Sequence, residues 1–161
     1  MTHIPREQLG DGESVRSEVT VPLERSLAYD RFTAQFGTWW PHEYHLGEDA
    51  TEFVLQAHTG GRWFERSSDG THTDWGQVVG ASPPYGISLT WAIDARWRPS
   101  PTAVSDLEVT FDEVPEGTRV VLQHSHLERA GEGWQELRDQ LAGDHGWGWV
   151  LSRFAGSVEQ P

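Results

Sequence analysis

The stretch Asp106–Leu127, DLEVTFDEVPEGTRVVLQHSHL, decides the fold because it predicts two strands around one tight turn. Apolar and polar residues alternate in both halves, which is typical of strands that bury one face of a sheet. Glu116 and Gly117 lie between the halves and predict the turn. A β-hairpin is therefore expected shortly before the C-terminal region.

The residues after this hairpin change from a strand period to a helix period. An apolar stripe with spacings of i, i+3, i+4, i+7 and i+11 is formed by Trp147, Val150, Leu151, Phe154 and Val158. A shorter run with helical spacing precedes it at Trp134, Leu137 and Leu141. The Gly-rich break at 143–146 predicts a kink or a boundary between two helices, with Asp144 as a candidate N-cap. We therefore expect a long amphipathic C-terminal helix.

Four short strands are expected upstream of the hairpin, between residues 51 and 93. Turn signals at Gly60-Gly61, Asp69-Gly70 and Pro83-Pro84 separate the runs EFVLQAH, RWFERS, DWGQVVGA and YGISLTWAI. The following stretch, Asp94–Val104, contains two prolines and predicts a loop.

The N-terminal part predicts one further strand and a short helix. Ser14–Val21 alternates as a half-buried strand does, and Leu23–Phe36 has apolar residues at roughly helical spacing. Ser26 is a candidate cap of this helix and Gly37 its expected stop. Thr38–Gly47, TWWPHEYHLG, follows as an aromatic turn. We expect residues 1–12 to form a flexible tail and residues 13–161 to form a single domain.

The resulting order of strand, helix, six strands and helix indicates an α+β domain. Neither a lone sheet nor a lone amphipathic helix can bury its own apolar face, so the C-terminal helix must pack on the sheet. A curved antiparallel sheet of six to seven strands with a long helix across it leaves room for a ligand between them.

Composition narrows the classes of partner. Nine of the 161 residues are Trp, and aromatic side chains dominate the energetics of cores and pockets. The formal net charge of −13 disfavours binding to nucleic acid, which requires clustered cations. A membrane partner is not expected, since no stretch approaches the roughly 20 apolar residues of a spanning helix.

The chain has no Cys, which excludes disulfides and thiolate sites, and its N-terminal residues show no signal peptide. We expect a cytoplasmic protein.

The chain resembles the SRPBCC proteins, specifically the bacterial branch named after the activator of the heat-shock-protein-90 ATPase. The segments that carry the resemblance are the opening strand with Pro22, WWP at 39–41, HLG at 45–47, GGRWFE at 60–65, Asp69-Gly70, DWGQV at 74–78, Pro83-Pro84, Thr90-Trp91, HSHLERAGEGW at 124–134, Gly146-Trp147 and VLSRFA. The resemblance implies a START-like helix-grip fold with an internal cavity. It does not imply one reaction, because the superfamily includes lipid carriers, plant hormone binders, polyketide cyclases and co-chaperone domains.

Two histidines near the end of the hairpin are candidate site residues. Strand parity places His124 and His126 on the same apolar side as Val120 and Leu122. They are candidates for a polar group that anchors a ligand or for general acid-base catalysis. The alternative is that they lie at the solvent-exposed edge of the core and have no functional role. Zinc bound by these two histidines with His42 and His45 is an alternative. We expect no metal and no cofactor.

The expected ligand-binding residues come from the sheet, the aromatic turn and the C-terminal helix. They are Trp39, Trp40, Trp75, Gln77, Trp91, Leu122, His124, His126, Trp147 and Leu151. Trp39 and Trp40 are expected at the cavity mouth, and Gln77 is expected on the same strand face as Trp75. Arg62 and Glu65 are expected on the solvated face, with a buried pair as the alternative.

Three functions remain open from the sequence. The first is binding of a small apolar or aromatic molecule in the cavity. The second is a cyclase, hydratase or dehydratase acting on a polyketide-like substrate with the cavity histidines. The third is a protein-interaction or co-chaperone-like module that uses an exposed WWPHEY turn. A homodimer is also consistent with a chain of this size.

Overall fold

The computed structural model describes residues 12–159, so the expected tail at residues 1–12 lies, except for Gly12, outside the described residues. In chain order the elements are β1 (Val15–Val21), α2 (Arg25–Phe32), α3 (Phe36–Trp39), β2 (Ala50–Leu55), β3 (Arg62–Ser67), β4 (His72–Ser82), β5 (Gly86–Trp91), β6 (Ser105–Val114), β7 (Gly117–Ser125), the 3-10 helix η1 (Leu127–Ala130), α4 (Trp134–Ala142) and α5 (Trp147–Glu159). None of the described helices is both long and apolar enough to span a membrane.

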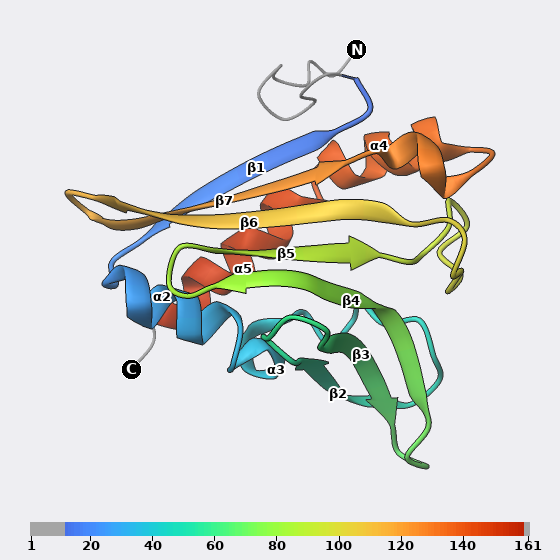
Figure 1. The fold of residues 1–161 in the computed structure, drawn as a ribbon, viewed down its shortest axis with the longest axis horizontal. Helices are drawn as coiled ribbons and strands as arrows, with labels where there is room; N and C mark the ends of the chain where they lie inside the picture. Colours follow the sequence, from blue (N-terminus) through green and yellow to red (C-terminus); the bar gives the residue numbers. More distant parts are fainter. Residues whose placement is uncertain (1–11, 160–161) are drawn as a thin grey trace.

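The seven strands form one antiparallel sheet in the order β1-β7-β6-β5-β4-β3-β2. The hairpin predicted from Asp106–Leu127 is continuous, with Asp106 opposite Ser125 and Val114 opposite Gly117. Figure 1 shows α5 running across one face of the curved sheet, with α2 and α3 near the end of α5. The strand count and the helix-grip arrangement expected from the sequence are confirmed.

The core lies between the sheet and α5. The α5 side chains Trp147, Val150, Leu151 and Phe154 are all buried, as their stripe predicts. Aromatic rings from α2 and α3 close the core at one end: Phe32 packs against Phe154 with ring centroids 5.2 Å apart. Burial of these apolar side chains provides the main favourable contribution to the free energy of folding.

The helix predicted for Leu23–Phe36 is instead two short helices, α2 and α3. Glu24 precedes α2 without a side-chain cap, so Ser26 is not the cap. Leu27 lies on the outer face, where 52% of its surface is exposed. Gly37 does not stop the helix but lies within α3, where an added Cβ would come 2.7 Å from the Phe53 carbonyl oxygen. The close approach of α3 to β2 thus requires glycine there.

The Gly-rich break at 143–146 is a boundary between the two helices α4 and α5. The Val150 N–H donates to the Gly146 carbonyl at 3.1 Å, so the first turn of α5 starts from Gly146 rather than from Asp144. Asp144 is exposed and is not the N-cap. The turn between the helices borders the cavity described next.

Candidate functional site

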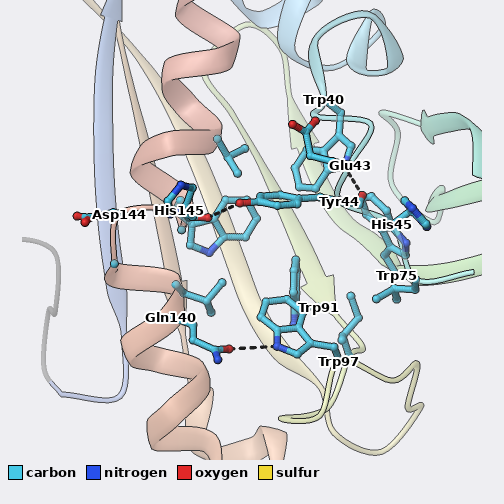
Figure 2. A pocket seen from close by; sticks show the side chains of 17 residues that line it. Trp40, Glu43, Tyr44, His45, Trp75, Trp91, Trp97, Gln140, Asp144 and His145 are labelled. Carbon is cyan, nitrogen blue, oxygen red and sulfur yellow. Dashed lines mark hydrogen bonds between the residues drawn. The ribbon is translucent and has the colours of Figure 1, made fainter.

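A cavity of about 520 Å³ lies between the sheet, the 40–46 segment and the junction of α4 and α5. Figure 2 shows the residues that line it, which are Trp40, Glu43, Tyr44, His45, Leu46, Trp75, Trp91, Ile93, Trp97, Gln140, Leu141, Gly143, Asp144, His145, Gly146, Trp147 and Val150. Its volume falls within the range of about 300–1,000 Å³ that is usual for small-molecule sites.

Five tryptophans form the walls of this cavity. Four of them, Trp40, Trp75, Trp91 and Trp147, are buried in the core, as their apolar surroundings require. Their rings pack against one another, with centroid distances of 5.1 Å for Trp40–Trp75 and 5.5 Å for Trp91–Trp147. The fifth, Trp97, is 40% exposed. The cavity is therefore bounded by wide, flat, apolar surfaces.

Hydrogen bonds fix four of the five indole rings. Trp40 Nε1 donates to the Tyr44 carbonyl at 2.9 Å and Trp97 Nε1 donates to Gln140 Oε1 at 3.1 Å. Trp75 and Trp147 donate to Glu65 and His124, as described below. The Trp91 N–H is buried and has no hydrogen-bond partner among the described residues.

Glu65 is a fully buried carboxylate behind the wall of the cavity. Its oxygens accept the N–H groups of Leu46 at 2.6 Å, Gly47 at 2.8 Å and Trp75 Nε1 at 2.9 Å. A buried carboxylate persists only when such donors replace its hydration. Glu65 thereby joins the loop before β2 to Trp75. The expectation of a solvated side chain is wrong for Glu65, whereas Arg62 is partly exposed and pairs with Asp74.

His124 is buried, and its predicted inward facing is confirmed. Trp147 Nε1 donates to His124 Nδ1 at 3.1 Å, so the proton of the neutral ring lies on Nε2, which donates to Ser105 Oγ at 2.7 Å. Burial lowers the pKa of His124 from 6.5 to about 3. Both ring nitrogens are occupied and His124 does not line the cavity. The side chain holds Trp147 in place.

The predicted facing of His126 is wrong. Strand β7 ends at Ser125, and His126 has a left-handed backbone with φ 60°. The alternation of a strand no longer applies beyond that residue. The His126 side chain is half exposed and lies 3.7 Å from Glu128.

The predicted facing of Gln77 is also wrong, because β4 contains an irregularity. Trp63 pairs with Gly76 but Phe64 pairs with Asp74, so Trp75 is the extra residue of a β-bulge. Trp75 and Gly76 are both buried, and the face of the strand is shifted by one residue. Gln77 is exposed as a result.

Trp39 lies in the core rather than at the cavity mouth. Its exposed fraction is 4%, and its ring packs 5.1 Å from Phe154. Trp39, Leu122 and Leu151 border a separate apolar void of about 10 Å³. Trp39 and Trp40 are both buried, so the WWPHEY turn does not expose these two rings as the interaction-module alternative assumed.

The rim of the cavity is polar, and two contacts cross it. Tyr44 Oη donates to the His145 carbonyl at 2.7 Å, which ties the 40–46 segment to the α4–α5 turn. The second contact is the hydrogen bond from Trp97 Nε1 to the side chain of Gln140 in α4 (Figure 2). Sequence reasoning missed Tyr44 and Gln140, because only the tertiary fold brings them to the cavity.

The histidines proposed as zinc ligands make other contacts. His42 Nε2 lies 3.3 Å from the Gly37 carbonyl, and His45 Nδ1 lies 2.8 Å from the Gly47 carbonyl. Within residues 12–159 no group of three or more His, Asp or Glu side chains is placed to hold a metal ion. The described residues thus offer no zinc site built from these histidines.

Comparisons with known proteins agree with the fold. A family model described as Activator of Hsp90 ATPase homolog 1-like protein matches residues 23–159. The solved structure of an anthrahydroquino-gamma-pyrone synthase, Txn09, complexed with SUM is 32% identical, covers 89% of this chain and 95% of that chain, and has a TM-score of 0.61.

Two further solved structures show the same fold. A protein from Nitrosomonas europaea is 17% identical, with 93% of this chain and 97% of that chain covered and a TM-score of 0.68. An AHSA1 protein from Silicibacter pomeroyi is 23% identical, with 91% and 97% covered and a TM-score of 0.63. No curated protein matched the chain.

Proposed function

Because the chain belongs to the family of Activator of Hsp90 ATPase homolog 1-like proteins and has their helix-grip fold, we propose that it binds a planar aromatic small molecule in its tryptophan-lined cavity. The observation that carries this proposal is the set of five tryptophans around about 520 Å³ of space. Offset or edge-on contact with such rings favours flat aromatic ligands by about 0.5–1.5 kcal/mol per ring pair.

The nature of the 32% identical relative supports the same ligand class. That protein is named for an anthrahydroquino-gamma-pyrone, a fused aromatic system. A fused aromatic molecule matches flat indole walls, and its oxygens match the polar rim that includes Tyr44 and His145. We therefore infer an oxygenated polycyclic aromatic ligand.

Isothermal titration with aloe-emodin, a hydroxymethyl dihydroxyanthraquinone, tests this proposal. The wild-type protein is expected to bind one equivalent. Val150→Trp places a large ring in the cavity and is expected to weaken binding at least about tenfold. Val79→Trp is the matched control, because Val79 is 58% exposed and does not line the cavity. Absence of saturable binding by the wild-type protein, or equal binding by the two variants, would contradict the proposal.

A second candidate function is ring closure on such a molecule. It is favoured by the 32% sequence identity to a protein named as a synthase, over 89% of this chain. In this reaction a phenol oxygen attacks a ketone carbon of an ortho-hydroxyaryl diketone. The new C–O bond forms, and the former ketone oxygen leaves as water to give the pyrone. The cavity side chains able to move protons are Glu43, Tyr44, His45, Asp144 and His145, whereas both nitrogens of His124 are engaged.

The simple substrate 1-(2-hydroxyphenyl)-1,3-butanedione tests this second function. Enzymatic formation of 2-methylchromone above the uncatalysed rate, reduced by Val150→Trp, is the expected result. A rate equal to that without protein would leave the chain as a binding protein only.

A further inference from the structure

Trp97 differs from the other cavity tryptophans in its backbone. Its φ is 62°, in the left-handed region where bulky side chains are rare. Such a conformation is unfavourable for a bulky residue and persists only where the surroundings enforce it. A large strained residue on the wall of a cavity calls for a functional explanation.

The loop around Trp97 enforces this conformation. Asp94 Oδ1 accepts the backbone N–H groups of Arg96 at 2.9 Å and Arg98 at 3.0 Å. The Trp97 N–H donates to the Asp94 carbonyl at 3.0 Å, and the Asp94 N–H donates to the Arg98 carbonyl at 2.9 Å. The backbone of this loop is therefore rigid.

The Trp97 side chain is held much less tightly than its backbone. It is 40% exposed, whereas the other four cavity tryptophans are buried. Its polar contact is the single bond from Nε1 to Gln140 Oε1 at 3.1 Å, and Gln140 is itself exposed. Its ring meets Trp91 edge-on, with centroids 6.2 Å apart. Rotation about the side-chain bonds therefore requires the loss of one exposed hydrogen bond and of the edge-on contact with Trp91.

Trp97 also lies at the solvent-exposed rim of the cavity. Figure 2 shows the Tyr44 contact to His145 on one side of the cavity and the Trp97 contact to Gln140 on the other. Tyr44 is only partly exposed, so Trp97 presents the larger apolar surface to solvent of these two rim residues.

We propose that Trp97 is the capping residue of the site: its ring turns away from Gln140 to admit a planar aromatic ligand and returns to cover the ligand face. This inference rests on the proposed binding function and names the residue that controls entry and retention. The strained backbone aims the ring at the opening, and the Gln140 amide holds it closed when no ligand is bound.

Stopped-flow measurement of aloe-emodin association and dissociation tests the cap. Gln140→Leu releases the ring without removing it and is expected to accelerate both association and dissociation. Trp97→Ala removes the cover and is expected to raise the dissociation rate by about tenfold, which corresponds to the upper range for one aromatic contact. Trp134→Ala is the matched control, because Trp134 is partly buried but does not line the cavity.

Trp97→Gly separates the cap from a merely structural role. Glycine tolerates a positive φ, so this variant is expected to unfold at a higher urea concentration than Trp97→Ala while it loses the ligand equally fast. Wild-type rates in both Trp97 variants, or unaltered rates in Gln140→Leu, would overturn the cap while leaving the binding function intact. Failure of the wild-type protein to bind aloe-emodin would instead overturn the binding function and the cap with it.

Discussion

At the scale of single residues, two buried polar side chains keep the tryptophan walls in place. Glu65 accepts three N–H groups, from Leu46, Gly47 and Trp75, and none of its partners is a cation. His124 is neutral and accepts the indole N–H of Trp147. Each joins a cavity wall to a different part of the sheet, so each affects both stability and the shape of the site.

Glu65→Gln is expected to destabilise the fold by about 1–3 kcal/mol. A glutamine amide brings its own N–H₂ group toward partners that are all donors, so at least one buried donor loses its acceptor. Urea unfolding measures the change. Glu52→Gln is the control, because Glu52 is about half exposed in its pair with Arg66 and such a pair contributes at most about 1 kcal/mol. Equal losses in the two variants would contradict the structural role of Glu65.

The unfolding free energy is expected to fall in acid through His124. Its pKa is about 3 in the folded protein against 6.5 ordinarily, so the unfolded state binds a proton that the folded state excludes. The contribution of His124 to the unfolding free energy is therefore complete above pH 6.5. It declines toward pH 3 by up to about 1.4 kcal/mol per pH unit. Between pH 7 and pH 5 the wild-type protein should lose up to about 2 kcal/mol more than His124→Gln. Identical losses would show that the ring takes up a proton in the folded state.

At the scale of elements, regular pairing decides what the sequence could predict. The hairpin of β6 and β7 has an unbroken register, and the inward facing of His124 followed from its alternation. The bulge in β4 reversed the expected facing of Gln77. The sequence indicates this bulge only through Gly76, because a glycine inside a strand often marks a bulge. The burial of Glu65 and the position of Trp97 depend on loops that meet other elements in three dimensions. No local sequence pattern predicts these tertiary contacts.

The hydroxyl of Tyr44 joins the 40–46 segment to the α4–α5 turn. Burial, with the nearby charge of Glu43, raises the pKa of Tyr44, so its hydroxyl remains a donor to the His145 carbonyl at neutral pH. Tyr44→Phe is expected to cost at most about 1.5 kcal/mol of stability and to raise the dissociation rate of aloe-emodin several-fold. Tyr85→Phe, at a residue 58% exposed and outside the cavity lining, should change neither quantity. Wild-type dissociation in Tyr44→Phe would show that this contact does not retain the ligand.

At the scale of the whole molecule, charge selects among aromatic ligands. The chain carries a formal net charge of −13, and the charged residues that line the cavity are Glu43 and Asp144, with no Arg among the described lining residues. Rhein has a carboxylate where aloe-emodin has a hydroxymethyl group, and the transfer of an unpaired carboxylate into an apolar site is unfavourable. Rhein should therefore bind at least about tenfold more weakly in titrations at low salt. Equal affinities would show that an unidentified group compensates the carboxylate.

The cavity exists only in the folded chain, so a ligand that binds in it should stabilise the fold as a whole. A ligand at about 100 times its dissociation constant adds about 2.7 kcal/mol. For a domain of this size, that corresponds to an increase in Tm of roughly 5–11 °C, measurable by calorimetry. Val150→Trp should show no such increase at the same ligand concentration.

A crystal structure of the protein with aloe-emodin at saturating concentration tests ligand binding in the tryptophan-lined cavity most directly. Density for the planar rings is expected inside the cavity, among Trp91, Trp97 and Trp147, with the indole of Trp97 over the ligand. Density for the ligand at a surface site, beside an empty cavity, would contradict it.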